Sequence, residues 1–422
     1  MAMGALMKDE LFEAQLVRAL GYAPYGGADY GECAATAARI TKTDPELWYA
    51  QWTATAARIR DLALASQASG ALASARSGLF RASNYYRTAG LFLMGAPVDP
   101  RLRESHRLEV ACFRDGAALL PQPPELIAIP YADTTLTGYF FRPGPGADRR
   151  PTLILVNGYD GTAEELYFTS GAAALARGYN VLTFDGPGQG TAIIDDGIPF
   201  RPDAEAVITP VVDAALQQPG TDPDRIALMG LSFGGYLAPR AATGEHRLAA
   251  CICDCGPYDL FDTSASRLPG FLARQLPDGN PAALNLLRRI LTAVMKKPTA
   301  GWALRRNLMV HGVSDPIEFF RLAPEYTLKG REQLITCPTL VCAAEGDDLS
   351  ARARLLFDAL TCEKEYIEFR AADGAGEHCE SGARTLFHQR AFDWLDAVLQ
   401  PRAEEPGGVS GARDRALLTP PA

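Results

Sequence analysis

Six short apolar runs alternate with helical stretches along the chain, and this alternation constrains the fold more than any other feature. The runs are TLILVNG (152–158), NVLTFDG (180–186), RIALMG (225–230), AACICDCG (249–256), TLVCAAEGD (339–347) and KEYIEFRA (364–371). Strands that are apolar along their whole length are buried on both faces, and helical crossovers join them in parallel. Two further strand-like runs, Glu125–Tyr131 and Thr135–Arg142, precede them around a polar turn. The sequence therefore predicts an α/β fold with a mostly parallel, eight-stranded sheet.

The 422 residues divide into parts of different character. Residues 1–122 carry apolar side chains at helical spacing, and Asp44-Pro45-Glu46 is a typical helix start, so we expect an N-terminal helical cap domain. Residues 123–400 form the domain that contains the sheet. Within it, residues 258–336 hold several helical patterns and no good strand, which predicts a helical lid insertion. Residues 401–422 are rich in Pro, Gly, Ala and charge, and we expect a poorly ordered tail.

Ser232 stands at the junction of an apolar strand and a helix, in the pattern Gly230-Leu-Ser-Phe-Gly234. A sharp strand-to-helix turn of this kind holds a serine in a strained conformation and exposes its hydroxyl at the carboxyl end of the sheet. The alternative is that Ser232 only caps the helix that follows it. The strand before the pattern and the helix after it favour a catalytic nucleophile.

A serine nucleophile needs a base, and His378 is the best placed of the five histidines. It lies in the glycine-rich loop AADGAGEHCESG, between the last strand and the last helix, where the histidine of a Ser–acid–His chain order falls. The other histidines lie in the helical cap, at the far end of the helix after Ser232, in the lid, or within the last helix: His106, His246, His311 and His388.

The acid of such a triad is expected after the penultimate strand, where TLVCAAEGDD offers Glu345, Asp347 and Asp348. Its role is to orient the imidazole and to stabilise the imidazolium. We select Asp347, with Asp348 as the next candidate. The alternative is that both aspartates are turn or capping residues for a helix that starts at Ser350.

An oxyanion hole needs two backbone N–H groups that point at the developing negative charge. One is expected from Phe233, the residue after the nucleophile. The other should come from the loop after the TLILVNG strand, at Tyr159 or Asp160.

Composition and motifs argue against several partners and cofactors. The net charge of −9 disfavours nucleic-acid binding, which requires a basic face. No run approaches the roughly 20 apolar residues that span a membrane, and we see no signal peptide, so we expect a cytoplasmic protein. The turn FDGPGQG (184–190) lacks the Lys-Ser/Thr of a phosphate-binding loop. No histidine, cysteine and carboxylate set has zinc-ligand spacing. We therefore expect neither a cofactor nor a metal.

The nine cysteines show no CxxC pair, which favours free thiols. Cys251, Cys253 and Cys255 alternate along one apolar run, a pattern that metal ligands can also produce. Alternate residues of a strand share one face, and small thiols pack well there, so we favour packing.

Five segments together resemble the α/β-hydrolase superfamily: NGYDGTAEELYF, FDGPGQG, GLSFGGY, EGDD and GAGEHCESGARTLFHQRAFDWL. Within it they are similar to the branch that contains dihydropseudooxynicotine hydrolase and fungal hydrolases that shorten pigment polyketides. The resemblance covers residues 125–400, and the helical block before them matches the cap of that branch more loosely. It implies Ser232 as nucleophile, Asp347 as acid and His378 as base. It also places Asp160 where dihydropseudooxynicotine hydrolase has a catalytically important Glu.

The resemblance implies hydrolysis of a carbon–carbon bond next to a ketone, and it implies a homodimer, since members of the branch often form dimers. We therefore expect a serine hydrolase acting on a medium-sized aromatic or polyketide-like small molecule through an acyl-enzyme. His378 or Asp160 would protonate the leaving carbon. An ester or amide hydrolase, an acyltransferase or cyclase, and a binding protein without catalysis are the alternatives. Aromatic residues of the two helical blocks are candidates for lining the site or for the core: Tyr85, Tyr86, Phe319 and Phe320.

Overall fold

The computed structural model describes residues 6–146, 148–276 and 279–399. Its centre is one eight-stranded sheet in the order β1-β2-β4-β3-β5-β6-β7-β8. β2 pairs antiparallel with both β1 and β4, and every pair from β4/β3 to β7/β8 is parallel. The strands are β1 (Glu125–Tyr131), β2 (Thr134–Phe141), β3 (Arg150–Val156), β4 (Asn180–Phe184), β5 (Thr221–Leu231), β6 (Ala250–Asp254), β7 (Thr339–Ala344) and β8 (Lys364–Phe369). This arrangement confirms the predicted fold class.

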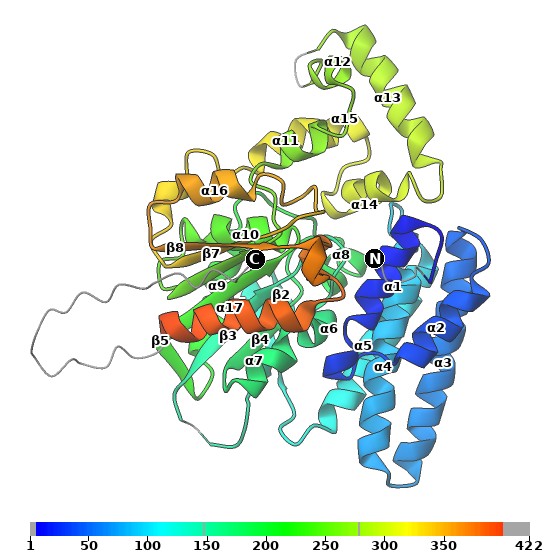
Figure 1. Cartoon of the computed structure of the whole chain (residues 1–422), viewed down its shortest axis with the longest axis vertical. Helices are drawn as coiled ribbons and strands as arrows, with labels where there is room; N and C mark the ends of the chain where they lie inside the picture. The colour runs from blue at the N-terminus through cyan, green and yellow to red at the C-terminus, as the bar shows by residue number, and fades with distance from the viewer. Residues whose placement is uncertain (1–5, 147, 277–278, 400–422) are drawn as a thin grey trace, which may run out of the picture.

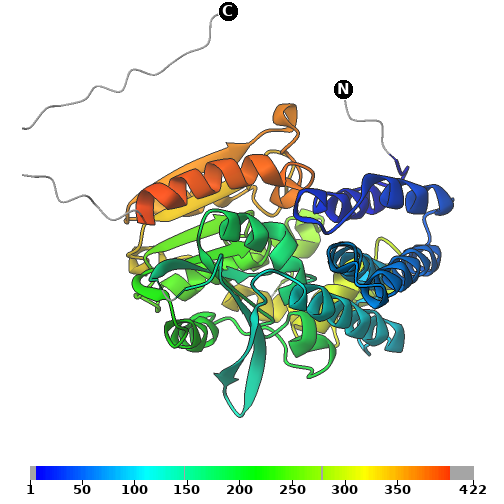
Figure 2. The same cartoon turned by 90° about the horizontal axis from the view of Figure 1, so that it is seen from below.

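Helices cover both faces of the sheet, which is why its central strands are apolar throughout (Figure 2). One face packs against α9 and α10, and the other against α7 and α17. The helices of the sheet domain outside the insertion are α6 (Ala163–Leu166), α7 (Ala172–Ala176), α8 (Gly190–Ile194), α9 (Glu205–Leu216), α10 (Gly234–Ala242), α16 (Ala353–Ala359) and α17 (Arg384–Leu399).

The strands β3 and β7 end earlier than the apolar runs suggest. β3 ends at Val156 and not at residue 158, and β7 ends at Ala344 and not at residue 347. After β3 the chain leaves the hydrogen-bonded ladder where Gly158 packs against Ser232, and after β7 it leaves where Asp347 meets His378, as described below.

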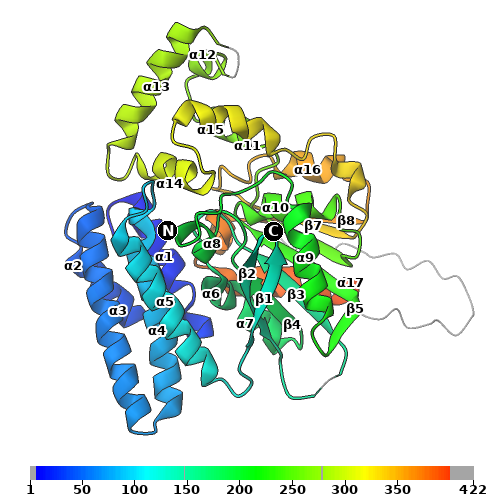
Figure 3. The same cartoon turned by 180° about the vertical axis from the view of Figure 1, so that it is seen from behind.

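The helices that precede the sheet pack beside it as a separate layer (Figures 1 and 3). They are α1 (Glu10–Leu20), α2 (Tyr30–Arg39), α3 (Pro45–Ala68), α4 (Leu72–Gly90) and α5 (Pro100–Ala118). Aspartates cap four of them by accepting backbone N–H groups of the first turn: Asp9, Asp29, Asp44 and Asp99. Their core is aromatic, with the rings of Phe12, Trp48 and Phe92 packed at centroid distances of 4.7–5.1 Å.

The chain between β6 and β7 is helical and lies beyond the end of the sheet at which α10 begins (Figure 1). Its helices are α11 (Leu260–Ala265), α12 (Gly270–Ala273), α13 (Pro281–Met295), α14 (Trp302–Val310) and α15 (Pro316–Leu322). α14 touches the N-terminal helices, because the Trp302 indole N–H donates to Leu91 O at 2.9 Å and its ring packs on Phe92. The two helical blocks therefore meet over the sheet.

The predicted tail, residues 401–422, lies outside the described residues. Among the helices that the structure describes, none combines the length and the apolar character that crossing a membrane requires.

Candidate active site

Ser232 occupies the sharp turn between β5 and α10 with a left-handed backbone, φ 60°. Its N–H donates to Asp254 O at 3.0 Å, which ties the turn to the end of β6. Only glycine fits on either side, because a Cβ on Gly230 would lie 1.8 Å from Gly234 O, and one on Gly234 would lie 2.3 Å from Val156 O. No side chain caps α10. The Ser232 hydroxyl is thus free for another partner.

That partner is His378, whose Nε2 lies 2.8 Å from Ser232 Oγ. The other ring nitrogen, Nδ1, lies 2.7 Å from Asp347 Oδ2. A carboxylate only accepts hydrogen bonds, so Nδ1 carries the proton and Nε2 is left to accept from the serine hydroxyl. The structure therefore brings the three predicted residues into one hydrogen-bonded relay, and the exposed Asp348 lies outside it.

Charges around the relay favour the protonated imidazole. Burial by itself lowers the pKa of His378, but the neighbouring Cys379 thiolate and the Asp347 carboxylate outweigh it and raise the pKa well above its usual value. Burial raises the pKa of Asp347, yet the attraction of His378 and hydrogen bonds from His378 and the Leu349 N–H bring it below the ordinary value. Asp347 therefore stays ionised beside an imidazole that readily accepts a proton.

The loop after β3 lies directly against the serine. A Cβ added to Gly158 would lie 2.7 Å from Ser232 Cβ and 3.0 Å from Phe233 N, so this approach also requires glycine. Among the residues that the structure describes, the backbone N–H groups of Phe233 and Tyr159 have no hydrogen-bond partner. Two unpartnered donors on the two segments beside Ser232 are the arrangement that an oxyanion hole needs.

The side chain of Tyr159 is fixed by its neighbours. Its hydroxyl lies 2.9 Å from His311 Nε2, just after α14, and its ring packs on Phe233 at 4.6 Å. The helical insertion thus holds the loop that carries the second donor.

The turn FDGPGQG also supports this loop. The Asp185 carboxylate accepts the N–H groups of Ala163 and Thr191, where α6 and α8 start, and the Gln189 amide donates to Asn157 O. These contacts within the protein account for the conformation of the turn.

Asp160 lies beside Tyr159 and forms two partly buried ion pairs. Its Oδ1 is 2.8 Å from Arg18 Nη1 of α1, and its Oδ2 pairs with Arg306 of α14. Burial raises the pKa of Asp160, but the two guanidinium groups outweigh this and hold it well below the usual range. Asp160 is therefore a permanent anion that joins both helical blocks to the oxyanion loop.

The ion pairs extend to a second carboxylate, Glu165, which Arg18 contacts at 2.7 Å and Arg87 at 3.3 Å. The pKa of Glu165 is lowered, since the arginines outweigh the effect of its burial. Three guanidinium groups then face two carboxylates, so these five side chains carry one uncompensated positive charge. No sequence pattern distinguishes these three arginines from the others in the chain.

A cavity of about 380 Å³ lies between the N-terminal helices and the oxyanion loop. Its lining includes Tyr86, Arg87, Met94, His106, Tyr159 and Asp160. The Nε of Arg87 is buried and has no hydrogen-bond partner in the described part of the chain. Of the four aromatic candidates, Tyr86 lines this cavity, whereas the other three are buried in the core: Tyr85, Phe319 and Phe320.

His106 lies at the wall of this cavity and away from the relay. Its Nδ1 is 3.3 Å from Glu109 Oε2, and its Nε2 is 3.1 Å from Thr191 Oγ1. Burial lowers the pKa of His106, but the hydrogen bond and charge of Glu109 raise it to about 9. It is a buried cation in the described structure and not a free base.

Comparison with known proteins agrees with the fold. Residues 153–405 match the model of the alpha/beta hydrolase family. Hydrolase acrC of Aspergillus aculeatus is 36% identical, over 92% of this chain and 96% of its own. The 20-hydroxy-prefusarin hydrolase FUS2 of Gibberella moniliformis is 34% identical, over 94% of this chain and 98% of its own.

The fold is also that of a solved structure, 2,6-dihydroxy-pseudo-oxynicotine hydrolase. The two share a TM-score of 0.71 and 23% identity over 90% of this chain and 96% of the other. The superfamily and the branch indicated by the sequence are thereby confirmed. The chain is a hydrolase and belongs to the alpha/beta hydrolase family.

Proposed function

We propose that Ser232, His378 and Asp347 form the catalytic triad of a serine hydrolase that cleaves a carbon–carbon bond next to a ketone in a medium-sized, aromatic or polyketide-like substrate. The hydrogen-bonded relay from Ser232 Oγ to Asp347, at 2.8 and 2.7 Å, is the observation that carries the proposal. The unpartnered N–H groups at its side supply the oxyanion hole.

The reaction starts when Ser232 Oγ attacks the ketone carbon and His378 Nε2 takes the hydroxyl proton. The oxyanion that forms accepts hydrogen bonds from the N–H groups of Phe233 and Tyr159. The carbon–carbon bond then breaks, its electron pair passes to the leaving group as an enolate, and His378 protonates that carbon. Water attacks the acyl-enzyme with His378 again as base, which releases the acid and restores Ser232.

The positive charge beside the oxyanion loop supports cleavage of a carbon–carbon bond. An enolate leaving group is an anion, whereas an alcohol can leave with a proton from His378. Arg87 lines the cavity beside this loop, and its Nε has no hydrogen-bond partner among the described residues, so it is our candidate for stabilising the enolate oxygen. Asp160 cannot deliver the proton, because its ion pairs keep it ionised. Protonation of the leaving carbon therefore falls to His378.

The substrate class is supported by the relatives. The similar proteins are named for hydrolysis of 20-hydroxy-prefusarin and of 2,6-dihydroxy-pseudo-oxynicotine. The same triad also serves the alternative, hydrolysis of esters or amides, and acyl transfer to an alcohol or amine if water is kept from the acyl-enzyme.

A paired panel of aryl esters and aryl 1,3-diketones of similar size tests the proposal, with products read by mass spectrometry. We expect cleavage of the diketones to two fragments by the enzyme and none by Ser232→Ala. Ester turnover without diketone cleavage would contradict the carbon–carbon reaction. Activity retained in Ser232→Ala would contradict the triad.

Arg87→Gln separates the two reactions. Loss of a charged hydrogen bond of about 1.5–3 kcal/mol predicts a roughly 10- to 100-fold lower kcat/KM on diketones, with esters changed far less. Arg81→Gln, in the same helix but directed to Glu32, is the matched control. Equal losses on both substrate types would refute a role for Arg87 with the enolate.

A further inference from the structure

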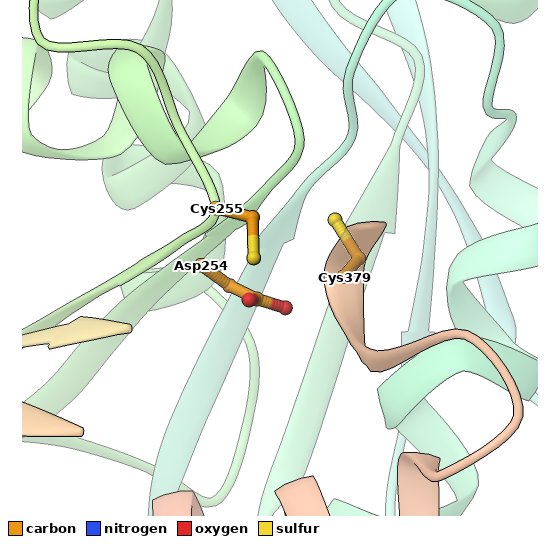
Figure 4. A group of neighbouring side chains, drawn as sticks. All are labelled: Asp254, Cys255 and Cys379. Atoms are coloured by element: carbon orange, nitrogen blue, oxygen red, sulfur yellow. The ribbon is translucent and has the colours of Figure 1, made fainter. Parts of the chain in front are cut away.

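A second group of reactive side chains lies next to the triad, at the end of β6 and in the turn after His378. It consists of Asp254, Cys255 and Cys379, and Figure 4 shows the three side chains facing the space between these segments. One ligand atom from each residue, two sulfurs and a carboxylate oxygen, lies within 4.8 Å of the others. Segments that are far apart in the sequence thus bring three metal-ligating groups together.

Both cysteines have a left-handed backbone conformation. Cys255 has φ 54° and Cys379 has φ 49°, in the left-handed region that non-glycine residues seldom adopt. Such strain persists only where the surroundings impose it. At Cys255 it takes the side chain out of the strand, and away from Cys251 and Cys253, whose sulfurs lie 4.0 Å apart and pack in the core of the sheet.

Asp254 supplies an oxygen without a partner. Its side chain is fully buried, and its Oδ2 accepts from Arg384 Nη1 at 3.1 Å. Its Oδ1 is buried and has no hydrogen-bond partner among the described residues. The Glu380 carboxyl, whose pKa is raised by burial and by the Asp254 charge, also lies within hydrogen-bonding reach of Asp254, so a cation bound here would compete with the Glu380 proton for this carboxylate.

The donor set selects the kind of ligand. Sulfur is a poor ligand for Mg²⁺ and Ca²⁺ but a preferred one for Zn²⁺ and related soft divalent cations. With Zn–S bonds of about 2.3 Å and Zn–O bonds of about 2.1 Å, tetrahedral ligand atoms lie roughly 3.5–3.8 Å apart. The three atoms lie within 4.8 Å of one another, so a side-chain adjustment of about 1 Å would close them around one ion.

We propose that Asp254, Cys255 and Cys379 bind a soft divalent cation, with Zn²⁺ as the representative, and that the bound cation inhibits the hydrolase. Cys255 releases its thiol proton to solvent, as does any Cys379 still protonated, when the two Zn–S bonds form. The thiolates, the carboxylate and Zn²⁺ sum to one negative charge, which the guanidinium of Arg384 balances. The fourth position is left for water.

Inhibition follows from the place of the site, and this half of the inference rests on the proposed role of His378 as base. Cys379 Sγ lies 3.7 Å from His378 Nε2. A dication bonded to that sulfur opposes the positive charge that the imidazole must gain when it takes the Ser232 proton. The expected effect is reversible loss of turnover with the triad residues unaltered.

Direct binding is measured on the full-length, metal-free enzyme with Co²⁺, whose thiolate complexes have a strong charge-transfer band in the near ultraviolet. We expect this band to saturate at one equivalent, to be displaced by Zn²⁺, and to be lost in Cys255→Ser and Cys379→Ser. Cys362→Ser, at a partly exposed thiol bonded to Thr339, is the matched control and keeps the band. Absence of a thiolate band would overturn the site.

A second measurement needs no variant. One equivalent of Zn²⁺ should protect Cys379 from alkylation while Cys362 in the same molecules still reacts, as read by peptide mass spectrometry. Equal labelling of Cys379 with and without Zn²⁺ would also overturn the site.

The proposed inhibition by the bound cation is measured as the rate of ester or diketone turnover with and without Zn²⁺. We expect at least a tenfold reversible loss with Zn²⁺, restored by EDTA and abolished in Cys379→Ser. Inhibition that survives in both cysteine variants would overturn the link between the site and the inhibition. Binding at this site with unchanged turnover would support the metal site and overturn the proposed inhibition, whereas the proposed function would stand.

Discussion

Replacement of Gly158 by alanine tests the oxyanion loop, because it adds one methyl group at the contact between that loop and the nucleophile. The added carbon would lie 2.7 Å from Ser232 Cβ and 2.8 Å from Ser232 Oγ. Carbon atoms in contact normally lie about 3.5–4.0 Å apart, so the overlap is about 0.8–1.3 Å. The loop must retreat by about 1 Å, and it carries the N–H of Tyr159 with it.

A displacement of about 1 Å at a reacting centre costs roughly 100-fold, and loss of one oxyanion donor costs about 100- to 1,000-fold in kcat. We therefore expect Gly158→Ala to lower kcat by about 100- to 1,000-fold, which corresponds to about 2.7–4 kcal/mol in the transition state. The assay is steady-state hydrolysis of an aryl ester, together with the rate of Ser232 labelling by a fluorophosphonate.

Gly144→Ala is the matched control, since a Cβ at Gly144 would have no atom within 4 Å. Thermal unfolding of both variants separates a catalytic effect from a loss of fold. If Gly158→Ala folds normally and keeps kcat within threefold of the parent enzyme, the loop after β3 does not supply an oxyanion donor and the reasoning is refuted.

Three further outcomes follow from the charges of the site. Asp347→Asn should lower kcat by about 10,000-fold. Because the Asp347 carboxylate raises the pKa of His378, the rising limb of the pH–rate profile for the residual activity should also move to lower pH. A rising limb at the same pH as in the parent enzyme would contradict this. The pKa of His106 is about 9 in the folded protein, above the value of about 6.5 for an unperturbed histidine. The pairing of His106 with Glu109 therefore stabilises the fold fully below pH about 6.5, and this stabilisation is lost as the pH rises to about 9. His106→Gln should therefore reduce the free energy of unfolding more at pH 6 than at pH 9.5, and equal losses in denaturant titrations would refute it. Asp160→Asn removes the anion shared by two partly buried guanidinium groups, of which Arg18 keeps Glu165, and should cost about 1–3 kcal/mol of unfolding free energy. An unchanged midpoint in denaturant titrations would contradict a stabilising role of these ion pairs.

The sheet and the triad could be predicted because their signals are local. An apolar run, a Gly-x-Ser-x-Gly turn and a helical pattern occupy neighbouring positions, and the chain order of the fold then places Asp347 and His378 at the same end of the sheet. The ends of β3 and β7 were less accurate, since the chain leaves the first strand where Gly158 approaches Ser232 and the second where Asp347 approaches His378.

The partners of Asp160 could not be predicted in this way. Arg18 and Arg306 lie 142 and 146 residues away, on the two helical blocks. The sequence contains 41 lysines and arginines, and no local pattern distinguishes these two from the others. Only the packing of the blocks against the sheet decides which cations are buried. The proximity of Cys255 and Cys379 could not be predicted either, because the fold brings them together from the end of β6 and from the turn after His378.

The ion pair between Arg18 and Asp160 has a consequence for biosynthesis. The first helix leaves the ribosome long before its partner, because 142 residues separate the two. At a translation rate of about 5–20 residues per second, Arg18 waits roughly 7–28 s before Asp160 exists. Helices α3, α4 and α5 can pack on one another during this delay, but α1 cannot bury its cation. The nascent N-terminal block therefore stays incomplete until β3 has been synthesised. In a chain stalled before that strand, the surface around Arg18 would remain exposed to chaperones.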